Sequence, residues 1–239
     1  MSRAIALLLL TGCDVVLGLE KVPAPPPCDP FDEDGDGFGN ACDACPADSD
    51  DGADGDMDLV GDACDPDRTA AGDQLRFFDG FDSNANAWMI TAGDWHLEGG
   101  AFVVATPSSS RVELPVAAMM PTVEAIIPTY TGDGTVSLFG ASGLSELRCS
   151  VSMTAGAESL KMQAFLVNME KPIPATTGPL RLVGGQHHDG TFYCRARHGD
   201  NFDIEVATAV APKQAIDKIG LLTDQASATV TSITVYEVP

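Results

Sequence analysis

The residues with the clearest chemical pattern are aspartates that alternate along one short segment. Asp32, Asp34 and Asp36 take positions 1, 3 and 5 of a twelve-residue loop that ends at Asp43. Calcium binds about six to eight oxygens, which such loops supply from alternating carboxylates, a backbone carbonyl at position 7 and a late carboxylate. A glycine at position 6 permits the sharp turn that would direct the carbonyl of Phe38 inward. The spacing therefore predicts a calcium-binding loop.

The same pattern recurs 22 residues later. Asp54, Asp56 and Asp58 alternate, Val60 stands at position 7 and Asp65 at position 12. Both copies end in Gly-(Asn/Asp)-Ala-Cys-Asp, and an internal repeat is stronger evidence than a single loop. The second copy has leucine at position 6, where the first has glycine, so we expect a strained turn or a weaker site there.

Negative charge is concentrated in this segment. The chain of 239 residues has a formal net charge of −22, and 15 of its 35 acidic residues lie between positions 28 and 67, where there is no Lys or Arg. Phosphate backbones and anionic lipid headgroups repel such a surface, so we expect no nucleic-acid partner. An acidic disordered linker is the alternative, but it would not need phased carboxylates, glycines and cysteines. Because the segment has few apolar residues, we expect it to fold only when a metal cancels its charge.

The combined spacing of Asp, Gly and Cys between Cys28 and about Asp67 resembles the thrombospondin type 3 calcium repeat. The resemblance implies that aspartates surround Ca²⁺ and that disulfides join the cysteines in sequential order, as Cys28–Cys42 and Cys45–Cys64. The ligands it implies are Asp32, Asp34, Asp36, Phe38, Asp43, Asp54, Asp56, Asp58, Val60 and Asp65. Possible additional ligands are Asn40, Asp48, Asp50 and Asp62.

The N-terminus has the pattern of an export signal. Arg3 precedes a short apolar run, and Leu10-Thr11-Gly12-Cys13 resembles the bacterial lipobox. The resemblance implies that residues 1–12 are a signal peptide and that Cys13 becomes the lipidated N-terminus. Prolines in residues 13–27 favour an extended tether. We therefore expect an exported lipoprotein of the bacterial cell envelope, on the outer membrane or cell surface, with the inner membrane as the alternative. A buried N-terminal helix is the competing interpretation.

The cysteine count supports an oxidising compartment. Seven cysteines are an odd number, and lipidation of Cys13 would leave six that can pair. Four of these lie in the acidic repeats of residues 28–68. Cys149 and Cys194 remain in the C-terminal part, where we expect a third disulfide, with two free buried thiols as the alternative.

From residue 75 onward the sequence predicts a β-domain. Thirteen short runs rich in Val, Ile, Thr and aromatic residues recur at roughly ten-residue spacing, separated by Gly, Asp and Pro. Among the strands we expect are 160–168, 218–223 and 229–237. Phe81-Asp82-Ser83, Gly93-Asp94-Trp95 and the stretch 98–102 resemble the opening of concanavalin A-like, laminin-G-type jelly rolls. The resemblance implies an all-β sandwich over residues 75–239, and a galactose-binding-like sandwich is the rival fold.

No set of residues in this domain favours catalysis. Asn201, Asp203 and Glu205 share one face of an expected strand and resemble the Glu-x-Asp-x-Glu strand of one endoglucanase family, but an amide is no nucleophile. His187 and His188 could bind a metal, although a polar loop explains them more simply. The two tryptophans could stack on sugar rings, but we expect them in the core.

The sequence as a whole favours an exported, lipid-anchored calcium-binding protein with a non-catalytic jelly-roll head. We expect this head to serve binding or adhesion through recognition of a glycan or a surface protein, and we expect contact with a membrane only through the lipid anchor. A hydrolase acting on polysaccharide and a purely structural envelope spacer are the two alternatives.

Overall fold

A computed structural model of the chain describes residues 28, 30–82, 86–105, 108–143, 145–164, 167–174, 178–199, 202–210 and 212–238. The expected signal peptide of residues 1–12, the tether of residues 13–27 with Cys13, and Asn201 lie outside the described residues. Within the described residues, no helix has the length and apolar character that would let it cross a membrane.

The described residues form fifteen β-strands, one 3-10 helix at Asn40–Cys42 and no α-helix. The strands are β1 (Gln74–Asp79), β2 (Met89–Ala92), β3 (His96–Leu97), β4 (Phe102–Val104), β5 (Ser110–Met119), β6 (Pro121–Ile127), β7 (Thr129–Ser142), β8 (Ser145–Thr154), β9 (Ala157–Ala164), β10 (Val167–Ile173), β11 (Leu180–Gln186), β12 (Thr191–His198), β13 (Phe202–Val210), β14 (Ala215–Val230) and β15 (Ser232–Glu237).

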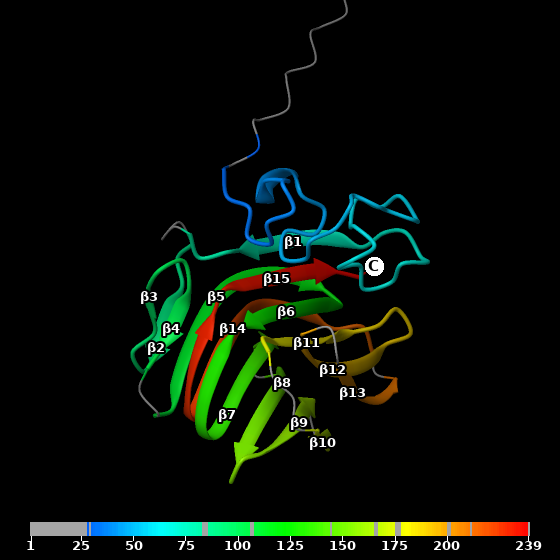
Figure 1. Cartoon of the computed structure of the whole chain (residues 1–239). Coiled ribbons are helices and arrows are strands. Elements are labelled where there is room, and N and C mark those ends of the chain that lie inside the picture. The colour runs from blue at the N-terminus through cyan, green and yellow to red at the C-terminus, as the bar shows by residue number, and fades with distance from the viewer. Residues whose placement is uncertain are drawn as a thin grey trace, which may run out of the picture.

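The strands pair antiparallel in two sheets that pack face to face (Figure 1). One sheet has six strands in the order β1-β15-β6-β11-β12-β13. The other has nine, in the order β10-β9-β8-β7-β14-β4-β3, with β5 on β14 and β2 on β5. The long strand β14 holds the second sheet together, because it pairs with β7 along its length and with β5 and β4 at its two halves. The architecture is the all-β jelly-roll sandwich that the sequence predicts.

Alternating residues build the core between the sheets. On β12, Phe192, Cys194 and Ala196 are buried in the core, while Arg195 and Arg197 between them face outward, as a period of two requires. The disulfide Cys149–Cys194 links β8 in one sheet to β12 in the other.

Trp95 lies in the core, as expected, whereas Trp88 is half-buried and packs against the core. Trp95 is 2% exposed, and its ring centroid lies 5.2 Å from that of Phe102. Trp88 packs on the same phenylalanine at 5.7 Å, and its Nε1 donates to Asp79 Oδ2 at 2.8 Å. Neither ring is therefore placed as an open platform for a sugar.

Two expected boundaries differ from the structure. We expected one strand over 160–168, but β9 and β10 form a hairpin there. We also expected separate strands at 218–223 and 229–237, but β14 continues from Ala215 to Val230. A register shift between Asp224 and Ala226 places Gln225 at φ +55°, so the strand passes this irregularity without ending.

The acidic segment lies across the outer face of the six-stranded sheet, over β1 and β15 (Figure 1). Cys45, Val60 and Cys64 form a small buried cluster with Tyr236 of β15. Arg181 of β11 forms ion pairs with Asp48 of the segment and with Glu124 of β6. The segment is therefore anchored on the sandwich and does not stand apart from it as a stalk.

Candidate metal centre and charged groove

The two acidic loops have the same backbone conformation. In the first, Asp32 accepts hydrogen bonds from the backbone N–H groups at positions 4 and 6, at 2.8 and 3.0 Å. In the second, Asp54 accepts the equivalent bonds at 2.7 and 3.0 Å. The disulfides Cys28–Cys42 and Cys45–Cys64 close the two repeats in the sequential order that the resemblance implies.

Three groups of carboxylates have oxygens within 4.8 Å of one another: Asp32, Asp34 and Asp36; Asp36, Asp43 and Asp50; and Asp54, Asp56 and Asp58. Asp36 belongs to two of these groups. Position 12 of the first loop therefore lies in a second cluster, which Asp50 of the following segment completes, and not in the cluster of positions 1, 3 and 5.

These clusters fit a hard cation. Buried carboxylate oxygens of Asp34, Asp43, Asp50 and Asp56 have no hydrogen-bond donor among the described residues. Buried charge without a partner is costly, and a cation ligated by oxygens relieves that cost. Because only oxygen donors surround these positions, the ligand set suits Ca²⁺.

The raised pKa values of two of these carboxyls also indicate that the clusters lack a cation partner among the described residues. Burial raises the pKa of Asp34 to about 6, and repulsion from Asp36 and Asp43 adds to this rise. Burial raises the pKa of Asp43, and repulsion from Asp36 and Asp50 contributes. Without a cation, these carboxyls hold protons more tightly than exposed aspartates do.

The other expected ligands have different contacts. Oδ1 of Asn40 accepts from the backbone N–H of Glu33 at 3.3 Å, and Oδ1 of Asp62 accepts from that of Gly55 at 2.8 Å, so both brace their loops. Asp48 pairs with Arg181 through two hydrogen bonds.

Position 7 is also alike in the two copies. The N–H of Phe38 donates to Asp36 at 2.8 Å, and the N–H of Val60 donates to Asp58 at 2.9 Å. Asp65, at position 12 of the second loop, lies beside Asp73, which the sequence did not single out.

The second loop has a left-handed backbone at two residues that are not glycine. Gly35 and Gly37 have φ +78° and +98° in the first loop, and Met57 and Leu59 have φ +68° and +78° in the second. This conformation costs a residue with a Cβ about 1–2 kcal/mol. The side chains of Met57 and Leu59 are 84% and 83% exposed, so little packing offsets the strain.

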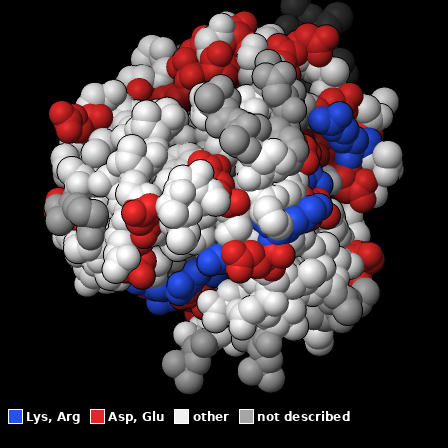
Figure 2. Space-filling model, turned by 60° about the horizontal axis from the view of Figure 1, so that its bottom comes forward, with Lys and Arg blue, Asp and Glu red and all other residues white. Residues whose placement is uncertain are grey.

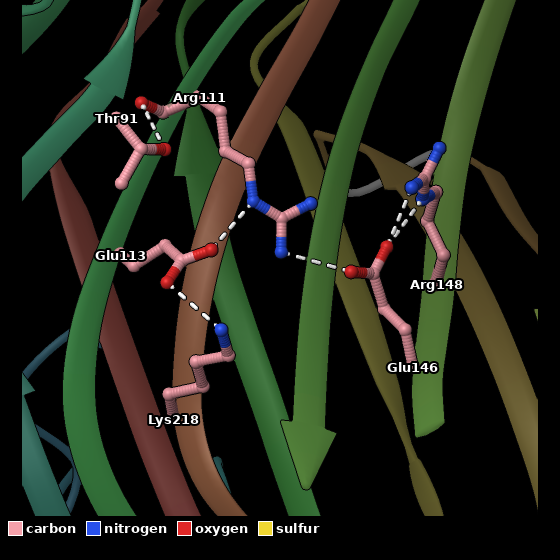
Figure 3. Close-up of polar contacts among 6 residues, drawn as sticks. All are labelled: Thr91, Arg111, Glu113, Glu146, Arg148 and Lys218. Carbon is pink, nitrogen blue, oxygen red and sulfur yellow. Dashed lines mark hydrogen bonds and ion pairs between the residues drawn. The ribbon is translucent and has the colours of Figure 1, made fainter. Parts of the chain in front are cut away.

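A second feature is a chain of ion pairs on the outer face of the nine-stranded sheet (Figure 3). Arg111 contacts Glu113 at 2.6 Å and Glu146 at 2.9 Å. Lys218 contacts Glu113 at 2.9 Å, and Arg148 contacts Glu146 at 2.5 Å. This network was not predicted from the sequence, although acid and base stand two apart on both β5 and β8, which places them on one face of a strand.

The network keeps its carboxylates ionised. Burial alone would raise the pKa of Glu113, but hydrogen bonds from Arg111 and Lys218 outweigh it and lower the pKa. Burial likewise raises the pKa of Glu146, but hydrogen bonds from Arg111 and Arg148 outweigh this effect and lower the pKa.

Beside the network lies a groove of about 420 Å³, and Arg148 lines it. Figure 2 shows basic and acidic side chains next to one another across the middle of one face, and a group of acidic side chains at its upper edge. The groove is lined mainly by side chains that can form hydrogen bonds, among them Ser137, Ser150, Lys161, Gln163, Asn168 and Glu170.

The remaining candidates from the sequence have structural contacts. Arg195 lies 3.7 Å from Asp203 and 2.7 Å from Glu205, so this arginine neutralises the two carboxylates. His187 stacks on Tyr193 with ring centroids 4.2 Å apart, while His188 lies near the acidic segment.

No family model and no curated protein matches the sequence. Solved structures match at low identity. A β-glucanase of Bacillus licheniformis is 11% identical with a TM-score of 0.52, and the match covers 68% of this chain and 98% of that one. A GH43 protein of the same species is 13% identical with a TM-score of 0.51, covering 68% and 39%. A carbohydrate-binding module from Bacillus subtilis is 15% identical with a TM-score of 0.46, covering 62% and 94%.

These likenesses show the fold alone, which is that of concanavalin A-like jelly rolls. The resemblances to the thrombospondin type 3 repeat and to the lipobox have no family model behind them and stay predictions.

We predict that Leu59→Gly stabilises the calcium-loaded protein. Glycine adopts the left-handed backbone without strain, but its unfolded chain has more entropy, so the net gain in the free energy of unfolding is up to about 1 kcal/mol. Leu59→Ala is the matched control, since it removes the exposed side chain and keeps the Cβ. Thermal unfolding in excess Ca²⁺ measures the difference, and a glycine variant no more stable than the alanine variant contradicts the account.

We also predict an inverted pH dependence in chelator. Burial raises the pKa of Asp65 to about 7, and contact with Asp73 contributes, while that of Asp34 is about 6. Carboxyls with a folded pKa above the unfolded value stabilise the protein at low pH and lose this effect as pH rises through the folded pKa.

Calorimetry in chelator should therefore show the acidic segment more stable at pH 5 than at pH 8. In saturating Ca²⁺ the order should reverse, because protons compete with the cation. Higher stability at pH 8 in chelator would show that these carboxylates do not repel one another.

Proposed function

We propose that this chain is an exported, lipid-anchored calcium-binding protein whose jelly roll binds glycan without hydrolysing it. The observation that carries the proposal is the repeated set of carboxylate clusters, with buried oxygens that no protein donor satisfies, fixed on the face of a jelly-roll sandwich. Three disulfides and the export pattern at the N-terminus support an extracytoplasmic location.

Calcium has a structural role in this proposal. Asp36 is shared between two clusters, so ions there would join the first loop to the segment that contains Asp50. Each ion would cancel two charges of a segment that otherwise repels itself. Asp48 then lies where Arg181 can hold the segment on the sheet.

The groove on the nine-stranded sheet supports a saccharide ligand. It is open and presents hydroxyl, amide and charged groups, which suit a ligand that has many hydroxyl groups and little apolar surface. Gln163 and Asn168 lie directly opposite each other on β9 and β10, and both are exposed. A β-glucanase of the same fold is named for a saccharide, which supports testing saccharides first.

The contacts of the carboxylates favour binding over hydrolysis. A glycosidase needs one protonated carboxylic acid beside one carboxylate. Glu113 and Glu146 both have lowered pKa values because arginine and lysine contact them, so neither is suited to hold a proton at neutral pH. Asp203 and Glu205 share Arg195 as a counter-ion.

A glycan array with the calcium-loaded full chain tests the binding function. We expect saccharide binding without turnover in a reducing-sugar assay. The double variant Gln163→Ala/Asn168→Ala should weaken binding on the order of tenfold, because two amides that contact the ligand are lost. Gln74→Ala, an exposed amide on β1 of the other sheet, is the matched control.

Turnover of any polysaccharide would replace this proposal with the hydrolase alternative. Failure to bind any saccharide, together with capture of a surface protein through the same groove, would replace the glycan with a protein partner.

Lipid anchoring is tested separately by labelling with palmitate in a bacterial host. Wild type should take up label and move to the membrane fraction, because lipidation requires the cysteine of the lipobox-like motif. Cys13→Ala should not label, and Cys149→Ala should label normally. Equal labelling of wild type and Cys13→Ala would remove the anchor from the account.

A further inference from the structure

The second acidic loop ends against the sandwich, where Asp73 directly precedes β1. Asp73 is 0% exposed, and its Oδ1 has no hydrogen-bond donor among the described residues. Its Oδ2 accepts from the backbone N–H of Asp67 at 3.1 Å. Nε2 of His188 lies 3.6 Å from Oδ1, which is within ion-pair distance when the imidazole is protonated but is too long for a hydrogen bond. A fully buried carboxylate therefore has half of its bonding capacity unused.

The surroundings of Asp73 repeat those of Asp50 in the first copy. There, the backbone N–H of Asp50 donates to Oδ2 of Asp36 at 3.2 Å, and both residues belong to one carboxylate cluster. In the second copy, the backbone N–H of Asp73 donates to Oδ2 of Asp58 at 2.7 Å. Asp58 stands 22 residues after Asp36, whereas Asp73 stands 23 residues after Asp50, and the N–H of Gly72 also donates to Oδ2 of Asp58 at 2.9 Å. Asp73 therefore corresponds to Asp50 through this hydrogen bond, with one extra residue in the second copy.

The third carboxylate of the first copy's cluster also has a counterpart in the second copy. Asp43 completes the cluster of the first copy, and Asp65 is its counterpart 22 residues later. The carboxyl of Asp65 lies beside that of Asp73, and Asp58 is close enough to repel both. Neighbouring carboxylates repel one another, and a cation between them relieves that repulsion.

We propose that Asp58, Asp65 and Asp73 form a further Ca²⁺ site at the seam between the acidic segment and the sandwich. The site extends the calcium-binding function proposed above and rests on it. The oxygens of these three carboxylates do not all lie within 4.8 Å of one another, as the oxygens of the three clusters do. The bound ion would therefore draw the three side chains together. Because Gln74 begins β1, the ion fixes the end of the second repeat to the first strand of the six-stranded sheet.

The test uses the full chain and the isosteric variant Asp73→Asn. Equilibrium dialysis with metal analysis should give one Ca²⁺ fewer than wild type at saturation. Asp51→Asn, an exposed acid of the same segment outside the three clusters, is the control and should bind the wild-type number. An unchanged number for Asp73→Asn overturns the site.

A stability measurement separates metal binding from packing. Asp73→Asn should lower the melting temperature in saturating Ca²⁺. In chelator it should leave the melting temperature unchanged or raise it, because an uncompensated buried charge is gone. An equal loss in both conditions means that Asp73 is purely structural and overturns the proposal.

Two further outcomes are distinguishable. If wild type binds no Ca²⁺ at all, the proposed calcium function fails with this site. If wild type binds Ca²⁺ but Asp73→Asn loses only Zn²⁺ or Mn²⁺, measured in parallel dialysis, the general function stands and the calcium assignment of this site is wrong. His188 makes that arm informative, because imidazole is a good ligand for these metals and a poor one for Ca²⁺.

Discussion

Clustered negative charge without a protein counter-ion is the constraint on which this structure depends. The repeats place the carboxylates of Asp32, Asp34 and Asp36 within 4.8 Å of one another, and the second copy does the same 22 residues later. Side chains this close repel, and several of their oxygens are buried with no donor. The backbone turns and the disulfides hold the ligands in place, but only cations can make this arrangement favourable. Most of the formal charge of −22 therefore lies in this one segment.

The sandwich gives the segment a surface on which to fold. Arg181 is the main electrostatic link, because it contacts Asp48 of the segment and Glu124 of the sheet. Burial raises the pKa of Glu124 even though the attraction of Arg181 opposes this. Loss of the arginine would leave two carboxylates facing each other at the interface. The acidic segment does not cover the network on the nine-stranded sheet. There, ion pairs with Arg111 keep Glu113 and Glu146 ionised.

Local patterns were predictable from the sequence, and contacts across the fold were not. Alternating aspartates predicted the two loops, and the resemblance to the thrombospondin type 3 repeat implied their disulfides. Short runs rich in β-forming residues at roughly ten-residue spacing predicted the all-β sandwich. The docking of the segment depends on Arg181, which stands 133 residues after Asp48 in the chain, so no local signal marks the pair. Asp50 was predicted only as a possible additional ligand and Asp73 was not predicted, because both lie outside the twelve-residue loops. Asp73 stands 23 residues after Asp50, one more than the repeat offset, so the offset alone does not point to it.

Hydrogen–deuterium exchange of the full chain in Ca²⁺ and in chelator tests the central claim most directly, because it reports on segment and sandwich separately. The account predicts that backbone amides of residues 30–73 are protected in Ca²⁺ and exchange rapidly in chelator, while β6, β7, β12 and β14 stay protected in both. Equal protection of residues 30–73 with and without Ca²⁺ would show that the disulfides and the sheet suffice, and would contradict the role given to the cations.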